Sequence, residues 1–127
     1  MPKILIVDDD PIIRNLLTQI LENFEEHGVA LLSVQEGSSA LDLIKKDKPD
    51  IVFLDVMMPQ INGFEVCNIV KNEYQMKDVY IIMLTARGQE VDRQKALDYG
   101  ADDYITKPFN INEITRKVSE ILKMEIS

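Results

Sequence analysis

The chain has 127 residues and a formal net charge of −8, from 22 acidic and 14 basic side chains. Its length and its 46% content of hydrophobic residues are typical of one globular domain with an apolar core of its own. The acidic balance argues against direct binding to nucleic acid, because phosphate backbones are bound by clustered lysine and arginine.

The first part of the chain combines a buried-strand pattern with a clear helical one. Residues 4–7 form an unbroken apolar run rich in β-branched side chains, which is typical of a strand covered on both faces. Apolar residues then recur every three or four positions from 13 to 24, with Asp10 placed to cap this helix and Pro11 in its first turn. A weaker strand is expected over 29–34.

The rest of the chain continues this alternation. The expected elements are a helix opened by Ser38 or Ser39 and reaching Ile44, a strand over 51–54, a helix over 64–74, a strand over 79–84, a helix over 89–99, a strand over 103–106 and a helix over 112–122. The helix over 89–99 is poor in apolar residues, with Val91, Ala96 and Leu97 as its core candidates. Five strands joined by helices predict a parallel sheet with right-handed crossovers, and thus one doubly wound α/β domain over 1–127.

Cysteine usage and the N-terminus bear on where the protein functions. Cys67 is the single cysteine, so an intrachain disulfide or a cysteine zinc site is excluded, and we expect a small core side chain. The apolar run before Asp8 is too short for a signal peptide, and no stretch approaches the roughly 20 apolar residues of a membrane helix. We therefore expect a cytoplasmic protein with no membrane partner.

Polar side chains follow the predicted strands at their carboxyl ends. Asp8 and Asp9 follow the first strand, and Asp55 follows the third. Thr85 and Lys107 follow the fourth and the fifth. In open α/β sheets this edge is where ligands bind. If the first and third strands are neighbours, the three carboxylates converge there.

Three converging carboxylates repel one another and favour a bound cation. Oxygen ligands suit Mg²⁺ better than Zn²⁺. Mg²⁺ beside a threonine hydroxyl and a lysine ammonium also forms a phosphoryl-binding set. Asp55, alone on its strand, is the candidate nucleophile that would become an aspartyl phosphate, and Asp8 and Asp9 are the candidate metal pair.

Five motifs at these positions match one known family in order and in spacing. They are Ile-Val-Asp-Asp at 6–9, Pro-Asp-Ile-Val-Phe-Leu-Asp at 49–55, Met-Met-Pro-Gln-Ile-Asn-Gly at 57–63, Leu-Thr-Ala at 84–86 and Tyr-Ile-Thr-Lys-Pro-Phe at 104–109. With these motifs the chain resembles, over its whole length, the receiver domain of response regulators, in particular single domains like the chemotaxis regulators. The resemblance implies a flavodoxin-like (βα)5 fold, with a five-stranded parallel sheet of order 2-1-3-4-5 and helices on both faces.

The resemblance also implies a reaction and its ligands. Asp55 would accept a phosphoryl group from a phosphohistidine on a sensor histidine kinase or a phosphotransfer protein, in two-component signalling. Asp9, Asp55 and the backbone carbonyl of Met57 would bind Mg²⁺ directly. Asp8 would act mainly through a bound water. Such a protein is not an enzyme in the ordinary sense, since it would catalyse only its own phosphorylation and dephosphorylation.

Further residues are implied to form a switch. Lys107 would pair with Asp55 and then with the phosphoryl group. Thr85 would turn inward to donate a hydrogen bond to a phosphoryl oxygen, and Tyr104 would move into the space that Thr85 vacates. The readout surface of the family is its fourth helix, fifth strand and fifth helix. It would meet a downstream effector protein, a fused output domain or a second copy in a homodimer.

Four further positions carry expectations from the same resemblance. Met57 and Arg87 flank the phosphorylation site and tune how long the acyl phosphate survives. Because an apolar Met57 cannot hold an attacking water by a hydrogen bond, we expect slower self-dephosphorylation than with asparagine there. Gly63 is expected where the backbone needs a positive φ or a close approach beside Asp55, and the Lys107–Pro108 bond is expected to be cis.

Two other functions compete with this interpretation. Asp8-Asp9-Asp10 has the Asp-x-Asp spacing of a haloacid-dehalogenase-type phosphatase with an aspartate nucleophile. Ile12 replaces the threonine usual in that family, and Lys107 follows Asp102-Asp103, where that family's lysine precedes the acidic pair. A flavodoxin-type redox module is disfavoured because no Ser/Thr/Gly-rich loop follows the first strand. Whether the domain stands alone or belongs to a longer regulator stays open.

Overall fold

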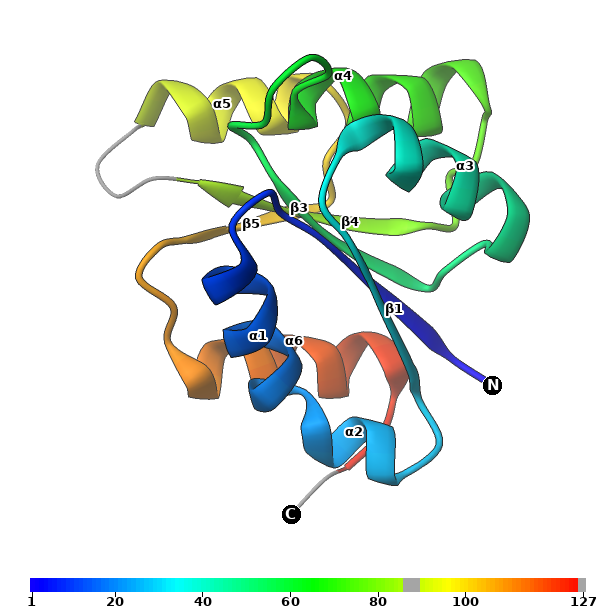
Figure 1. Ribbon diagram of the computed structural model, residues 1–127, viewed down its shortest axis with the longest axis vertical. Coiled ribbons are helices and arrows are strands. Elements are labelled where there is room, and N and C mark those ends of the chain that lie inside the picture. Colours follow the sequence, from blue (N-terminus) through cyan, green and yellow to red (C-terminus); the bar gives the residue numbers. More distant parts are fainter. Residues whose placement is uncertain (86–89, 126–127) are drawn as a thin grey trace.

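The computed structural model describes residues 1–85 and 90–125 and contains a five-stranded parallel sheet (Figure 1). The strands lie in the order β2-β1-β3-β4-β5, and every neighbouring pair is parallel. Their bounds are β1 Lys3–Val7, β2 Ala30–Val34, β3 Ile51–Asp55, β4 Tyr80–Thr85 and β5 Asp103–Thr106. The expected flavodoxin-like sheet order is confirmed.

Helices cover both faces of the sheet. Their bounds are α1 Pro11–Ile20, α2 Glu22–Glu26, α3 Gly37–Asp47, α4 Gly63–Asn68, η1 Ile69–Glu73, α5 Glu90–Asp98 and α6 Ile111–Leu122. In Figure 1, α1, α2 and α6 lie against one face, and α3, α4 and α5 lie against the other. Parallel strands need such crossover helices, because each connection must return to the starting edge. None of the helices in the described ranges is long and apolar enough to cross a membrane.

Side chains of the strands alternate between two apolar clusters. Leu5 and Val7 of β1 pack into the cluster that holds α3 and α4. Ile4 and Ile6 pack into the opposite cluster, which holds α1, α2 and α6. All four side chains are fully buried. Burial on both faces explains why the strands are continuous apolar runs, without alternating polar residues.

The first helix differs from the single helix that the periodicity predicts. α1 ends at Ile20, Leu21 has a φ of −94° and a ψ of 5°, and α2 restarts at Glu22. Leu21 and Phe24 are nevertheless fully buried in the same cluster. Apolar spacing identifies the buried residues correctly, but it cannot reveal a break between two helices when both bury side chains in the same cluster.

The helix that follows β2, α3, starts earlier than expected. α3 begins at Gly37, and Glu36 occupies the N-cap position. The hydroxyls of Ser38 and Ser39 donate to Glu36 Oε1 at 3.4 and 3.3 Å. The expectation that a serine opens this helix is wrong, because the serine hydroxyls bind the Glu36 carboxylate and lie within the first turn.

The third helix divides into α4 and the π-helical turn η1. The backbone N–H of Tyr74 donates to the carbonyl of Ile69 at 2.8 Å, which is a five-residue step. Val70 and Lys71, consecutive in this turn, are both buried. A wider turn of this kind lets neighbouring side chains face inward together.

The fourth helix, α5, is described from Glu90 onward. Gln89, its expected first residue, lies outside the described residues, as does the side chain of Val91. Ala96 is buried as expected, but Leu97 is 47% exposed. The expectation for Leu97 is wrong. Consecutive helical residues point about 100° apart, and in α5 the inward direction falls on Ala96 and not on Leu97.

Candidate functional site

Three carboxylates converge at the carboxyl edge of the sheet. β1 and β3 are neighbours with Val7 beside Leu54, which brings together the residues that follow, Asp8 and Asp55. One oxygen each of Asp8, Asp9 and Asp55 lies within 4.8 Å of the others. Asp8 and Asp55 are buried, whereas Asp9 is exposed. The cluster therefore has two buried carboxylates and one that faces solvent.

Both side-chain oxygens of Asp8 accept hydrogen bonds from the protein. Oδ1 accepts from the backbone N–H of Asp10 at 2.9 Å. Oδ2 accepts from Nζ of Lys107 at 3.2 Å. Asp9 and Asp55 are consequently the two carboxylates with the greater remaining capacity to bind a ligand.

The backbone of Asp8 is held as well. Its N–H donates to the carbonyl of Val34 at 3.3 Å, and its carbonyl accepts from Nη1 of Arg14 at 2.6 Å. Sequence reasoning missed Arg14 as a residue of this site. The available signal was that Arg14 is the one charged residue in the α1 sequence.

Asp55, the last residue of β3, has two donors on one oxygen. Oδ1 lies 3.2 Å from Nζ of Lys107 and 3.4 Å from the backbone nitrogen of Met57. Burial, followed by the nearby Asp8 carboxylate, raises the pKa of Asp55 to about 6, against the opposing effect of Lys107. A carboxylate with a raised pKa is more basic, which favours reaction as a nucleophile once it is ionised.

Lys107 joins the two buried carboxylates. Its Nζ lies 3.2 Å from both Asp8 Oδ2 and Asp55 Oδ1. Burial on its own lowers the pKa of Lys107, but Asp55 and Asp8 outweigh it and the net pKa is raised. Its backbone N–H donates to the carbonyl of Thr85 at 2.8 Å. The Lys107–Pro108 bond is cis, as expected.

Thr85 contributes a buried hydroxyl at the end of β4. Its Oγ1 makes no hydrogen bond within the described part of the chain, and the residue is 1% exposed. β4 lies next to β3 with Leu84 beside Asp55, so Thr85 is the next residue along the same edge of the sheet as the acidic cluster. Burying a hydroxyl without a partner is costly, and an acceptor atom bound here would remove that cost.

Two further expected site residues, Tyr104 and Met57, lie in the described part of the chain. Tyr104 is half-buried on β5 beside Met83 and packs against the cluster under α3 and α4. The Met57 side chain is 73% exposed, and its backbone contacts Asp55. Arg87 lies outside the described residues.

Gly63 permits α4 to begin directly against the site. A Cβ at Gly63 would lie 2.2 Å from the carbonyl oxygen of Asp55, which real Cβ atoms do not tolerate. Its N–H donates to the carbonyl of Val56 at 3.0 Å. Of the two expected reasons for this glycine, close approach is the one that applies. Asn62 and Glu65 form a capping box that holds the start of the helix.

The acidic cluster fits a hard divalent cation. Its ligand atoms are carboxylate oxygens, and no histidine or cysteine among the described residues belongs to it. Exposure of Asp9 leaves one side open, so that a cation can keep several of its waters. This donor set suits Mg²⁺ better than Zn²⁺.

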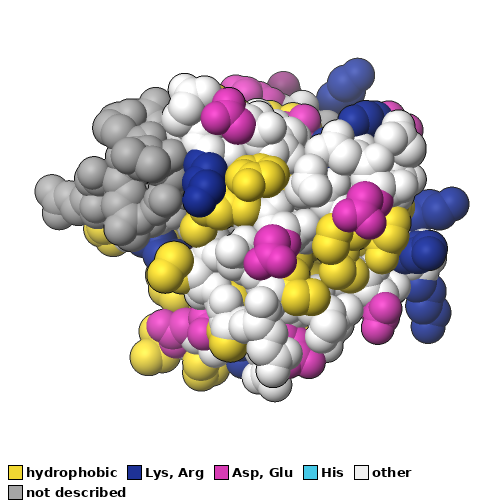
Figure 2. Space-filling view, turned by 90° about the horizontal axis from the view of Figure 1, so that it is seen from above, with side chains coloured by type: hydrophobic (Ala, Val, Ile, Leu, Met, Phe, Trp, Pro, Cys, Tyr) yellow, Lys and Arg dark blue, Asp and Glu magenta, His cyan; other side chains and the backbone are white. Residues whose placement is uncertain are grey.

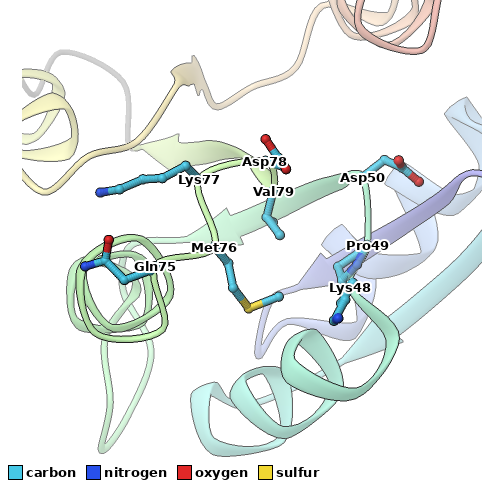
Figure 3. A pocket seen from close by; sticks show the side chains of 8 residues that line it. All are labelled: Lys48, Pro49, Asp50, Gln75, Met76, Lys77, Asp78 and Val79. Carbon is cyan, nitrogen blue, oxygen red and sulfur yellow. The ribbon is translucent and has the colours of Figure 1, made fainter.

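A separate hollow of about 330 Å³ lies at the other edge of the sheet (Figure 3). It is lined by residues 48–50 and 75–79. These segments immediately precede β3 and β4, and so lie at the amino ends of the strands. The acidic cluster lies at the carboxyl ends, and the hollow is therefore not part of it.

Comparisons with known proteins give one consistent family. A family model described as response regulator receiver domain matches residues 4–119. A solved structure described as a response regulator from Chloroflexus aurantiacus is 34% identical with a TM-score of 0.87, and the match covers 97% of this chain and 99% of that chain. Chemotaxis protein CheY4 of Vibrio cholerae is 30% identical with a TM-score of 0.82, over 95% of this chain and 98% of that chain.

A third similar structure contains a partner. The receiver domain of Ssk1 from Saccharomyces cerevisiae, in a co-crystal with the histidine phosphotransfer protein Ypd1, is 26% identical with a TM-score of 0.83. The match covers 94% of this chain and 87% of that chain.

Proposed function

This chain belongs to the response regulator receiver domain family, whose members act in two-component signalling, and from that premise we propose that Asp55 is its phosphoacceptor. One observation carries the proposal. Asp55 is buried at the end of a central strand, 3.2 Å from the Lys107 ammonium, with the unsatisfied Thr85 hydroxyl on the adjacent strand. A phosphoryl group on Asp55 would meet both a cation and a hydrogen-bond donor.

In the proposed reaction, a carboxylate oxygen of Asp55 attacks the phosphorus atom of a phosphohistidine. The O–P bond forms as the P–N bond breaks, and the electron pair of the broken bond stays on the imidazole nitrogen. No atom changes its oxidation state, and the product is an acyl phosphate. With a pKa of about 6, Asp55 is mostly ionised at neutral pH while remaining more basic than an ordinary carboxylate.

Receiver domains bind Mg²⁺ at their acidic site, and the Asp8, Asp9 and Asp55 cluster has suitable ligands. We propose that Asp9, Asp55 and the backbone carbonyl of Met57 are the direct ligands. Asp8 acts through a bound water, which is supported by the protein donors on both of its oxygens. Bound Mg²⁺ supplies charge neutralisation of the phosphoryl oxygens.

We propose that the switch runs from the phosphoryl group to the readout surface. Lys107 pairs with the phosphoryl group, Thr85 turns to donate to it, and Tyr104 moves into the vacated space. The readout surface is α5, β5 and α6, which binds a downstream effector, a fused output domain or a second copy. Figure 2 looks onto α3, α4 and α5 and shows apolar side chains gathered in separate patches between acidic ones.

The phosphodonor is proposed to dock beside the acidic cluster. The segments next to the cluster in the chain carry exposed apolar side chains. Met57, two residues after Asp55, and Ile12, at the start of α1, are each 73% exposed, and Leu16 of α1 is 38% exposed. Ile12 and Leu16 are four residues apart on α1 and so share one helical face. The similar receiver domain of Ssk1 binds a histidine phosphotransfer protein in its co-crystal, which supports the same class of partner here. A sensor histidine kinase is the alternative donor.

Receiver domains are generally not classical enzymes, and we propose that this one catalyses only its own phosphorylation and dephosphorylation. The rival phosphatase mechanism needs Asp8 and Asp10 as its reactive pair. Here both Asp8 oxygens have protein donors, and Asp10 Oδ1 caps α1 by accepting from the N–H of Ile12 at 2.9 Å. This engagement favours Asp55 as the nucleophile.

Two further proposals concern the extent of the domain and the location of the protein. We propose that residues 1–127 are a single receiver domain, since the family match spans 4–119. We also propose a cytoplasmic location, because the phosphohistidine of a kinase is made from cytoplasmic ATP.

The phosphoacceptor is tested by intact mass after incubation with Mg²⁺ and acetyl phosphate. Wild type should gain one phosphoryl group, and Asp55→Asn should gain none. Asp42→Asn, which removes an exposed carboxylate on α3, is the matched control and should behave as wild type. Equal phosphorylation of Asp55→Asn and wild type, or none in wild type, would refute the proposal. Turnover of phosphomonoesters would favour the phosphatase.

A further inference from the structure

Arg14 turns back from α1 toward the acidic cluster. Its Nη1 donates to the carbonyl oxygen of Asp8, six residues earlier, at 2.6 Å. That distance is at the short end for an N–H···O bond, and the donor is a permanently charged guanidinium. The side chain is half-buried. A guanidinium held in this way restricts the backbone that it contacts.

The carbonyl that Arg14 holds lies in the short connection between β1 and α1. The ladders of β1 end at Val7, and α1 begins at Pro11. The peptide unit that contains the Asp8 carbonyl also contains the N–H of Asp9, and this unit is planar. Since the Asp8 nitrogen is bound to Val34, a second bond at the carbonyl fixes the direction in which the chain leaves toward Asp9.

Asp9 depends on this backbone support. In the ranges that the structure describes, its exposed carboxylate has no hydrogen bond or ion pair to orient it, in contrast to Asp8 and Asp55. Its position within 4.8 Å of the other two carboxylates is therefore set through the main chain. Partners of a metal ligand commonly control metal affinity in this indirect way.

Two physical effects of Arg14 on a bound cation have opposite signs. As a positive charge near the cluster, Arg14 would repel the cation and weaken its binding. As a support for the Asp8 carbonyl, it would strengthen binding by holding Asp9 in place. Arg14 makes no ion pair with a carboxylate among the described residues, and its contact is to a carbonyl. Its charge therefore lies beyond ion-pair distance of the carboxylates in the cluster, whereas its contact with the carbonyl is direct, and we expect the support to be the larger effect.

We infer that Arg14 is a positioning residue for the divalent cation of this site. Arg14 holds the Asp8 carbonyl, and this contact directs the neighbouring Asp9 carboxylate toward the carboxylates of Asp8 and Asp55. The inference rests on the proposed function, because it concerns the cation that assists phosphorylation of Asp55.

The test is a Mg²⁺ titration followed by backbone amide chemical shifts, combined with phosphorylation by acetyl phosphate at a series of Mg²⁺ concentrations. Arg14→Gln should raise the Kd for Mg²⁺ about tenfold. Its phosphorylation rate at saturating Mg²⁺ should stay close to that of wild type. Arg116→Gln removes the same charge from an exposed position on α6 and should leave the Kd unchanged.

Arg14→Lys keeps the charge but lacks the guanidinium, and it should weaken Mg²⁺ binding as well. Unchanged or tighter Mg²⁺ binding by Arg14→Gln would overturn the inference, as would a rate loss that saturating Mg²⁺ does not restore. Should Arg14→Gln fail to fold, the Kd of Arg14→Lys decides by the same criterion. A wild type that binds no Mg²⁺ and is not phosphorylated would refute the proposed function itself. A wild type that does both, with an unaltered Kd in Arg14→Gln, refutes only this inference.

Discussion

Asp55 is placed between one side chain that opposes its ionisation and one that favours it. Burial and the Asp8 carboxylate raise its pKa, while the Lys107 ammonium at 3.2 Å lowers it. Ionised Asp55 is thus costly in the unliganded protein, and a second cation would be stabilised beside it. At the scale of single residues, the same electrostatic repulsion that makes ionised Asp55 costly in the empty site favours the binding of a cation there.

Met57 is expected to prolong the phosphorylated state. Its side chain is 73% exposed and has no group that can orient water toward the phosphoryl group on Asp55. Met57→Asn supplies such a group, and the half-life of the phosphorylated protein should fall about tenfold. The measurement is the decay of phosphoprotein, by intact mass, after the donor is removed.

Met57→Leu is the control for this prediction. It keeps an apolar side chain of similar size, so its half-life should match that of wild type. An asparagine variant that decays as slowly as wild type, or more slowly, would contradict the expectation.

At the scale of elements, the π-helical turn η1 is tied to the start of β5. The buried Lys71 Nζ donates to Asp102 Oδ2 at 2.7 Å and to the carbonyl of Lys77 at 3.3 Å. Asp102 Oδ2 also accepts from the backbone N–H of Ile81 on β4 at 2.9 Å. The extra residue of the π turn thereby brings a buried cation to a carboxylate beside the proposed readout surface.

The two partners of this ion pair should differ in their effect on stability. Asp102→Asn leaves the Lys71 ammonium buried without its carboxylate and should lower the free energy of unfolding by about 2 kcal/mol. Lys71→Met removes the charge itself, and its cost should stay below about 1 kcal/mol. Urea denaturation of both variants and of the double variant measures these values.

The double variant separates charge burial from general disruption. With Lys71 already replaced by methionine, Asp102→Asn should cost little more. If the two substitutions are instead additive, the buried ammonium is not the cause of the loss.

At the scale of the whole molecule, the parallel sheet gathers residues that are far apart in sequence. Lys107 and Asp8 are separated by 99 positions and still form an ion pair. The sheet brings the carboxyl ends of β1, β3 and β5 to one edge, which also gathers like charges there. The repulsion between these carboxylates therefore lowers the free energy of unfolding of the whole domain.

That cost should appear as a pH dependence of stability. The pKa of Asp55 rises from 3.8 to about 6 on folding, so the folded state binds more protons than the unfolded state between these values. The free energy of unfolding should therefore fall as pH rises through this window, with an Asp55 contribution of about 3 kcal/mol by neutral pH. Asp55→Asn should lose this contribution and be the more stable protein at neutral pH.

Urea denaturation in EDTA, at several values between about pH 4 and about pH 7, tests this expectation. Asp42→Asn is the matched control and should follow the wild-type curve. Parallel curves for Asp55→Asn and wild type would show that Asp55 does not carry the penalty.

Local patterns predicted most of the sheet and the residues at its edge. The runs at 4–7 and 51–54 lie in β1 and β3, because strands covered on both faces leave an unmistakable apolar signal. Helix boundaries were less predictable. Leu21 and Phe24 stay buried across the break between α1 and α2, and Val70 is buried in the π turn at 69–73. Neither change therefore disturbs the apolar spacing noticeably.

By itself, the sequence determined the parallel α/β fold and the set of acidic, hydroxyl and ammonium groups at the strand ends, because strand burial and strand-end position are local properties. Only the tertiary structure decided how those groups are paired. That Arg14 supports the Asp8 carbonyl, and that a buried Lys71 reaches Asp102, depends on contacts between separate elements. Such contacts follow no period in the sequence, because the packing of elements brings the partners together.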